Sequence, residues 1–524
     1  MTPGRVALGG VLVVAAALRA VALGATPLDP FYDAAVRTMG GSWHAFLTGA
    51  IDPSGQVSVD KPPVDLWLQV ASTKVVGFNT VGLLLPSVIG GVVAVLLLYD
   101  LVRTLAGPRA ALIAAAALAV LPIDVITARS DTMDGVMSAL ILGALAVTAR
   151  GARDGRPSRV VIGGALMGLA FEVKLFEALL GFIPLAVLWL AGAHDVPWRR
   201  RVLALGGAGA AFVAVGLAWL VTLTLAVPAS QRPWAFGSSD GSAWSATFVY
   251  DGWQRLTGAA LPTASGAVGH GTVPAPPGPL RLLSGQDGML GRLGLELALA
   301  WGLVLVLLAR RRDRFGPGLS PGLLALGAWL LVGTVLFSVQ AGFRPRYAEA
   351  FVGAIAGVIG IAAARLGGRG VLIATVVVLA ASAGVAAAAV GDHVEDSGTL
   401  GAMPPARLAS LDDYLRAHQA GARYEAADVA VTKAAALITR SGEPQLILDA
   451  DRGQTLVPPS ALARAVARGE VRYAVSGGSC RVVVASDACS PDARWIRAHG
   501  TDVSRAAGQP YGGVVYRLGV GHGG

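Results

Sequence analysis

Eleven long apolar segments, separated by short polar connections, constrain this chain more than any other feature. Several reach the roughly 20 residues that a helix needs to cross the hydrocarbon core of a bilayer. They lie at 6–25, 81–102, 110–127, 133–149, 160–174, 177–192, 202–227, 290–309, 319–338, 347–364 and 370–390. Only 14% of the 524 residues are charged, whereas a soluble domain carries about a quarter. The sequence therefore predicts an α-helical polytopic membrane protein with about 11 transmembrane helices.

The first apolar segment is open to two interpretations. Residues 6–25 follow Arg5 and end in Ala-Leu-Gly-Ala, which is similar to a cleavable signal peptide. The segment is long, contains Arg19 and begins a chain that crosses the membrane repeatedly. A retained first span is the favoured interpretation.

Basic residues predict the orientation of the spans. Alternate connections carry Arg103 and Arg109; Arg150, Arg153, Arg156 and Arg159; Arg199, Arg200 and Arg201; Arg310, Arg311, Arg312 and Arg314; and Arg365 and Arg369. The short connections between these carry only Arg129, Lys174, Arg344 and Arg346, so the positive-inside rule places the amino terminus in the cytoplasm. Three large regions then lie outside: 26–80, 228–289 and 392–524. The predicted division is a transmembrane domain at 1–391 and an extracytoplasmic domain at 392–524.

The carboxyl-terminal region has a different pattern. Strand-like runs at 445–449 and 471–475 alternate with helix-like stretches at 405–419 and 459–468, which predicts a small α/β domain. Both cysteines, Cys480 and Cys489, lie there. Outside the cytoplasm a local disulfide between them is expected, with two separate thiols as the alternative. The net charge of +9 comes from short arginine clusters, so no nucleic-acid partner is expected.

The first outer region holds two acid motifs. Asp29 lies just beyond the first span, and Asp33 follows four residues later. If a helix begins after Asp29, this side chain is its N-cap with Pro30 at the first helical position, and capping alone is the alternative to a functional role. Farther on, Asp60 and Lys61 precede two prolines that hold both side chains on a rigid turn, although an ordinary exposed turn would look the same.

Two short connections on the same side are also charged. Asp131 and Asp134 are three residues apart at the start of the fourth span, so they share a helix face, and Arg129 accompanies them. These charges exceed what capping requires. The fifth span ends at Lys174 beside two glutamates, where snorkelling or a salt bridge is the alternative to a functional role.

The connection before the tenth span carries Arg344, Arg346 and Glu349, although the positive-inside rule expects few cations there. A charge at the edge of a span costs about 2–3 kcal/mol or more, so it needs a partner or a wet cavity. The outer face is therefore the expected place for a polar site.

The cationic part of this set consists of Lys61, Lys174, Arg129, Arg344 and Arg346. Lysine and arginine hold phosphate, and a phosphate-containing lipid would place its head group at this face. Sugar transfer from a polyprenyl phosphate needs a base more than an acid, because cations stabilise the leaving phosphate. An aspartate that accepts the proton of the acceptor hydroxyl, with attack on the opposite face of the sugar, would give inversion.

Cofactor motifs are sparse. No glycine-rich loop joins a strand to a helix, so no nucleotide cofactor is expected, and the seven histidines are scattered. The candidates for organising the site or holding a divalent metal ion are the carboxylates Asp60, Asp131, Asp134 and Glu349.

The chain resembles the C superfamily of membrane glycosyltransferases (GT-C), and within it family 39, which includes protein O-mannosyltransferases, the aminoarabinose transferase that acts on lipid A, and bacterial members labelled mannosyltransferases. The likeness rests on the loop Asp29–Asp33, the turn Asp60-Lys61-Pro62, the aspartate Asp134, the lysine Lys174, and the tail segments Leu411–Leu415 and Gly469–Tyr473. The resemblance implies a polyprenyl-phosphate sugar donor and a lipid, protein or cell-wall glycan acceptor, in a protein embedded among membrane lipids.

The resemblance also implies residue roles. Asp29 is expected to be the catalytic base or to orient the acceptor, Lys61 and Lys174 to hold the lipid phosphate, and Asp60 and Asp134 to organise the site or a divalent ion. Many relatives have an acidic pair where this chain has Asp29 followed by proline, so Asp33 is the alternative base.

Two other functions fit the spans. A lipid or solute transporter would have charges at the membrane midplane, broken helices and related halves. Here the charges lie at one boundary and no internal repeat is apparent. An assembly or sensor protein that displays the carboxyl-terminal domain would account for that domain but not for the acids and lysines. The sequence thus favours the glycosyltransferase.

Overall fold

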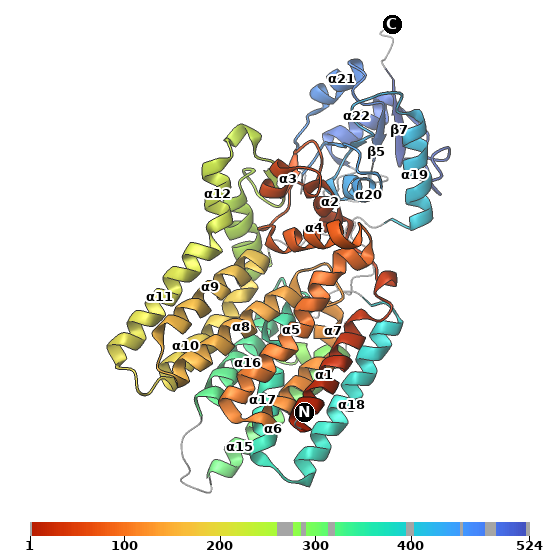
Figure 1. Ribbon diagram of the computed structural model, residues 1–524. Coiled ribbons are helices and arrows are strands. Elements are labelled where there is room, and N and C mark those ends of the chain that lie inside the picture. The colour runs from red at the N-terminus through yellow and green to blue at the C-terminus, as the bar shows by residue number, and fades with distance from the viewer. Residues whose placement is uncertain are drawn as a thin grey trace.

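A bundle of long apolar helices carries a small α/β domain at one end (Figure 1). The computed structural model describes residues 3–258, 276–284, 290–312, 320–394, 403–450, 454–476 and 489–519. The bundle helices are α1 (Pro3–Ala20), α5 (Thr80–Ala106), α6 (Pro108–Val120), α7 (Pro122–Thr127), α8 (Asp134–Arg153), α9 (Pro157–Lys174), α10 (Phe182–Gly192), α11 (Trp198–Gly216), α12 (Ala218–Ala226), α15 (Leu295–Arg312), α16 (Pro321–Val339), α17 (Val352–Leu366) and α18 (Arg369–Gly391).

Shorter elements connect the bundle helices. They are η1 (Leu23–Ala25), α2 (Pro30–Met39), α3 (Trp43–Thr48), β1 (Val57–Ser58), α4 (Val64–Val76), η2 (Leu175–Gly181), η3 (Ala229–Gln231), β2 (Trp234–Ala235), α13 (Ala243–Ser245), the π-helix η4 (Ala246–Gln254), α14 (Arg255–Thr257), η5 (Arg281–Leu283), η7 (Leu290–Gly294) and η8 (Pro345–Phe351). Helices α2, α3 and α4 lie at the end of the bundle that carries the α/β domain (Figure 1).

Each of the eleven predicted segments lies mainly in helix, and the protein is a multi-pass membrane protein. Seven described helices are long and apolar enough to cross a bilayer, or eight if the bent pair α11–α12 is one span. The number is lower than eleven because α6 has only 13 residues, because α9, η2 and α10 form one apolar stretch of 36 residues, and because α15, which carries Glu296 and ends in three arginines, is not among the candidate spans. The number of crossings stays a prediction.

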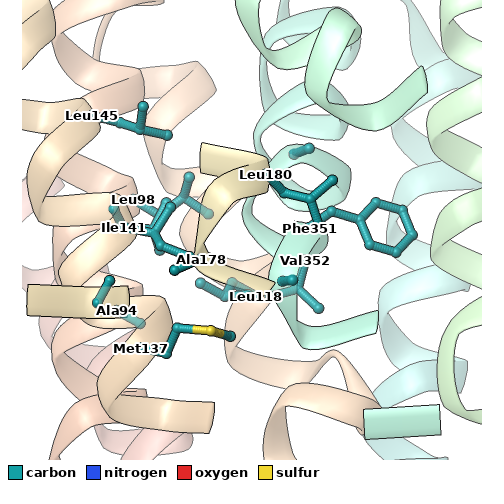
Figure 2. Packing of buried hydrophobic residues seen from close by; sticks show 14 of the residues in the cluster. Ala94, Leu98, Leu118, Met137, Ile141, Leu145, Ala178, Leu180, Phe351 and Val352 are labelled. Atoms are coloured by element: carbon teal, nitrogen blue, oxygen red, sulfur yellow. The ribbon is translucent and has the colours of Figure 1, made fainter. Parts of the chain in front are cut away.

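Apolar side chains from six elements fill the centre of the bundle. Leu98 of α5, Met137 and Ile141 of α8, Leu180 of η2 and Phe351 of η8 belong to one cluster and are almost fully buried (Figure 2). Close packing of this kind holds the ends of α8, η2 and η8 in fixed positions. Those three ends carry many of the predicted site residues.

Glycine allows α5 and α8 to cross closely where α8 begins. A Cβ atom on Gly135 would lie 2.5 Å from the main-chain oxygen of Ser87, and one on Gly90 would lie 2.7 Å from the main chain of Gly135. Small residues at such a contact let two membrane helices approach. The crossing fixes the position of Asp134, the first residue of α8.

Arg19 ties α1 to the break between α6 and α7. Pro122 has no N–H, so α6 ends and leaves carbonyl groups without helical partners. The guanidinium of Arg19 donates to the carbonyl oxygens of Leu118 (3.3 Å) and Ala119 (3.1 Å), and it also pairs with Asp124. All of these groups are buried, so the contact satisfies polar atoms that lipid could not.

The α/β domain contains a five-stranded sheet, as the sequence predicted. Its elements are α19 (Pro405–His418), β3 (Ala427–Asp428), α20 (Val431–Ser441), β4 (Leu446–Ile447), α21 (Pro459–Ala467), β5 (Tyr473–Val475), α22 (Pro491–His499), β6 (Gly500–Asp502) and β7 (Val515–Leu518). The strand order is β4-β3-β5-β7-β6, in which β4, β3 and β5 are parallel and β7 is antiparallel to β5 and β6.

Helix α2 is packed between the bundle and the α/β domain. Ala434 and Ile438 of α20 belong to the same apolar core as Phe31 and Ala35 of α2. Polar contacts reinforce the interface, and one example is the Thr439 hydroxyl, which donates to the carbonyl oxygen of the first α2 residue over 3.2 Å. The helix that carries Asp29 and Asp33 is therefore fixed from both sides.

Candidate active site

The acid side of the site begins with Asp29, which is both the N-cap of α2 and a neighbour of a second carboxylate. Its Oδ1 accepts from the main-chain N–H of Phe31 over 3.1 Å, and Pro30 occupies the first helical position. The main-chain N–H of Asp29 donates to Oδ2 of Asp131 over 2.7 Å. The capping role predicted as an alternative is present, and it places the Asp29 carboxylate beside the connection before α8.

Asp33 lies one turn farther along α2 and is fully buried. Neither of its carboxylate oxygens has a hydrogen-bond partner in the described part of the chain. Burial raises its pKa well above the ordinary value, and the nearby charges of Asp131 and Asp29 raise it further. Both effects favour the protonated form of Asp33, which disfavours this carboxyl group as a general base.

Asp60 and Lys61 lie against α2. The ammonium of Lys61 donates to the hydroxyl of Tyr32 over 2.7 Å and to Oδ2 of Asp60 over 3.1 Å. Burial opposes both charges, but the attraction between them wins, so the pKa of Asp60 is lowered and that of Lys61 is raised. Lys61 therefore stays cationic in a buried position beside the amino end of α2.

Arg255 was not predicted from the sequence as a site residue, but it contacts three side chains of the site. It pairs with Asp251 one helical turn earlier, donates to Oδ2 of Asp60 over 3.3 Å, and donates to the hydroxyl of Tyr347 over 3.2 Å. The parallel pairing of β1 with β2 joins the two large outer regions and brings Arg255 to Lys61. The available signal was an Asp and an Arg at (i, i+4) spacing within an otherwise apolar and glycine-rich outer region.

Arg344 differs from every other predicted cation of the site. Within the described residues it makes no hydrogen bond and no ion pair, yet it is partly buried. Burial lowers its pKa, the nearby phenol of Tyr347 opposes this, and the charges of Arg346 and Arg255 lower the pKa further. A crowded cation without a counter-charge favours binding of an anion.

Lys174, at the end of α9, pairs with Asp134 and lies 3.6 Å from Oε2 of Glu177. Oδ2 of Asp134 also accepts from the hydroxyl of Thr132 over 2.7 Å. Glu177 is within electrostatic range of Lys61 and Arg346, so this group adjoins the Lys61–Arg255 group.

Two predicted site residues, Arg129 and Glu349, make hydrogen bonds that stabilise the fold. The guanidinium of Arg129 donates to the carbonyl oxygens of Leu18, Arg19 and Val21 and to the hydroxyl of Thr26. It therefore satisfies the open carbonyl groups at the end of α1.

Glu349 accepts from two hydroxyl groups, that of Ser138 over 2.6 Å and that of Thr127 over 3.1 Å. It joins η8 to α7 and α8. These hydrogen bonds make Glu349 a structural link between the three elements.

The predicted metal and disulfide sites have different outcomes. In the part of the chain that the structure describes, no three His, Cys, Asp or Glu side chains are arranged to hold a metal ion. The expected disulfide between Cys480 and Cys489 stays a prediction, because Cys480 lies outside the described residues.

Sequence comparisons relate the first half of the chain to known proteins. Residues 60–219 match the family described as dolichyl-phosphate-mannose-protein mannosyltransferase. The protein named Putative mannosyltransferase YycA, of Bacillus subtilis (strain 168), is 32% identical over 238 residues, which cover 45% of this chain and 34% of that protein. The chain therefore spans about a third of the length of the curated relatives it matches.

Structural similarity extends over the whole chain. ArnT from Cupriavidus metallidurans in the apo state matches with a TM-score of 0.60 at 17% identity, over 98% of this chain and 97% of that one. This chain has the GT-C fold. ArnT bound to undecaprenyl phosphate matches with a TM-score of 0.55 at 19% identity, over 84% of this chain and 85% of that one. The predicted GT-C architecture, a helical bundle with a small α/β domain, is confirmed.

Proposed function

We propose that this GT-C protein is an inverting glycosyltransferase that moves a sugar from a polyprenyl-phosphate donor to an acceptor hydroxyl. The match to a mannosyltransferase family and the similarity to ArnT, which has been crystallised with undecaprenyl phosphate, support the reaction class and the lipid carrier. The single observation that carries the proposal is Arg344, a partly buried guanidinium without a partner among the described residues, beside Arg255 and Arg346.

Departure of the carrier explains the need for these cations. When the bond between the sugar C1 and the phosphate oxygen breaks, the lipid leaves as a phosphate monoester with one more negative charge. Arg344, Arg255, Arg346 and Lys61 stabilise that added charge more than they stabilise the donor, which lowers the barrier. Lys174 completes the set from the neighbouring group.

Asp29 is the proposed base. It removes the proton from the acceptor hydroxyl as the acceptor oxygen attacks C1 from the face opposite the phosphate, so the configuration inverts. Asp33, the alternative from sequence, is disfavoured because burial and the neighbouring carboxylates favour its protonated form. Asp131 positions Asp29 by accepting from its main-chain N–H. No step is assigned to a metal ion.

The proposed orientation places the amino terminus in the cytoplasm and the α/β domain outside. Its support is the alternation of arginine-rich and arginine-poor connections along the sequence. The donor would then be used at the extracytoplasmic membrane surface.

The purified full-length protein should release polyprenyl phosphate from at least one member of a panel of polyprenyl-phosphate sugars. The panel should vary the sugar on one carrier, and the released lipid phosphate should be measured with and without a crude envelope acceptor. Transport of an intact donor across proteoliposomes without any cleavage would contradict the proposal and favour the transporter interpretation.

A further inference from the structure

A polar pocket opens at the opposite end of α2 from Asp29. It has a volume of about 840 Å³ and is bounded by the end of α2 and the start of α3, the turn at 50–55, residues 230–232, and the end of α20 in the α/β domain. Its polar lining includes Arg37, His44, Asp52, Ser230, Arg232 and Ser441. Three parts of the chain that are distant in sequence thus build one pocket, and the α/β domain supplies part of its wall.

Asp52 is the unsatisfied group in this lining. Its side chain is fully buried, and Oδ1 accepts from the main-chain N–H groups of Gln56 (2.9 Å) and Val57 (3.0 Å). Oδ2 has no hydrogen-bond partner in the described part of the chain. Burial raises the pKa of Asp52 to about 6, against the effect of these N–H groups, so it is largely ionised at neutral pH. A ligand hydroxyl or amine that donates to Oδ2 would complete its hydrogen bonds.

The two arginines of the lining already have main-chain acceptors. Arg37 donates to the carbonyl oxygen of Thr439 over 3.1 Å, and Arg232 donates to that of Val227 over 2.7 Å. Two donors of each guanidinium are therefore committed to the main chain, in contrast to Arg344. The remaining lining offers hydroxyl groups, a carboxylate oxygen and an imidazole, which suits a neutral ligand rich in hydroxyls.

The position of the pocket relates it to the proposed base. Arg37 is eight residues beyond Asp29 on the same helix, which at a rise of 1.5 Å per residue is about 12 Å along the axis. A group bound there cannot be the reacting hydroxyl, but it can be a remote part of the same molecule, whose binding energy supports the reaction.

We propose that this pocket binds a carbohydrate portion of the acceptor, remote from the hydroxyl that reacts at Asp29. The inference rests on the proposed glycosyltransferase function and names the acceptor class as a glycan or glycosylated molecule. About half of the pocket lining is polar, and a lipid chain or an apolar peptide side chain would leave those polar groups without partners.

Binding to the full-length protein in detergent tests the proposal. The probes are mannotriose and maltotriose, with a neutral tripeptide for comparison, and binding is followed by saturation-transfer NMR. We expect one of the trisaccharides to bind, and Ser230→Trp, which fills the pocket from an exposed position, to weaken that binding at least tenfold. Asp52→Asn should weaken it about fivefold, because the amide keeps the turn but loses an acceptor.

The matched control is Ser239→Trp, at an exposed serine outside the pocket lining, which should bind the trisaccharide normally. Equal binding by wild type and Ser230→Trp would overturn the proposal, as would binding of the tripeptide in preference to both sugars or binding of no probe at millimolar concentration. Donor cleavage by the wild type reports the proposed function separately. If trisaccharides bind but no donor is cleaved, the pocket stands as a carbohydrate site and its acceptor role is wrong.

Discussion

The two sides of the candidate site differ in how their charges are matched. On the acid side, Asp29, Asp33 and Asp131 lie close enough to raise the pKa of Asp33, and the nearby Arg129 is directed to main-chain carbonyl groups. On the cation side, Lys61, Arg255, Arg344 and Arg346 outnumber the carboxylates Asp60 and Asp251, and Arg344 has no partner among the described residues. The acid side suits the proposed proton transfer, and the cation side suits the proposed binding of the lipid phosphate.

The same difference in charge matching separates two arginines, Arg129 and Arg344. Arg129 and Arg344 were both predicted to hold phosphate, and both lie at the same end of the bundle. Arg129 has four hydrogen-bond acceptors, most of them at the end of α1, whereas Arg344 has none in the described residues. A buried cation whose donors are satisfied stabilises the fold, and one whose donors are open is available to a ligand.

Asp29→Asn should give the largest effect. Loss of a general base lowers the rate of sugar transfer about 1,000-fold, within the usual range for such catalysis. Asparagine is an equally good N-cap, so the protein should still insert and fold. The measurement is the rate of polyprenyl-phosphate release in the presence of acceptor.

Asp33→Asn is the matched control for the acid side. Its amide has the shape of a protonated acid, so transfer should stay within about tenfold of the wild type. Equal losses in the two variants would remove the distinction between Asp29 and Asp33, and a larger loss in Asp33→Asn would make it the base.

Arg129→Ala should lower the stability of the protein and leave its binding of the donor nearly unchanged. It leaves the carbonyl groups at the end of α1 without donors, which should cost about 3 kcal/mol of unfolding free energy. We expect a lower Tm in detergent, a lower yield, and near-normal donor KM for the folded fraction. A normal Tm with a raised donor KM would instead return Arg129 to the phosphate site.

Arg344→Ala should lower the catalytic efficiency with the donor and leave the stability of the protein unchanged. The folded protein should keep its Tm, because no hydrogen bond or ion pair of the described residues is lost, while kcat/KM for the donor falls about 100-fold, or about 2.7 kcal/mol. Arg344→Lys should recover part of the loss, because it restores the charge without the planar fork. Arg369→Ala, at an exposed arginine that begins α18, is the control and should change neither quantity.

Hydropathy was sufficient to predict most of the fold. Because apolar length is set by bilayer thickness, all the apolar segments were found, and the α/β domain followed from its change of pattern. The end of α9 at Lys174 was predicted, but the backbone conformation that follows it was not. It occurs at Leu175, with φ of 53°, where neither glycine nor proline marks a turn. Tertiary packing imposes that conformation.

The site was predictable as a set of charges but not as a set of pairs. Lys61 and Asp60 are adjacent in sequence, so their contact was foreseeable. Arg255 reaches Asp60 through the pairing of β1 with β2, two short strands that are far apart in the chain. Such short strands leave no periodic pattern, and the partners of Arg129 are main-chain atoms that no motif encodes.

Asp33 offers the smallest and most direct test of the acid side. Its pKa in the folded protein is well above its ordinary value near 4, so the folded state binds this proton more tightly than the unfolded chain. The stabilisation is complete below about pH 4 and is lost as pH rises through the raised pKa. Between pH 6 and pH 9 the Tm of Asp33→Asn should therefore fall by a few degrees less than that of the wild type. Asp240→Asn, at an exposed aspartate in an outer region, should follow the wild type. If Asp33→Asn also follows it, the carboxylates at α2 do not repel one another as the structure indicates, and the acid side is matched by a cation after all.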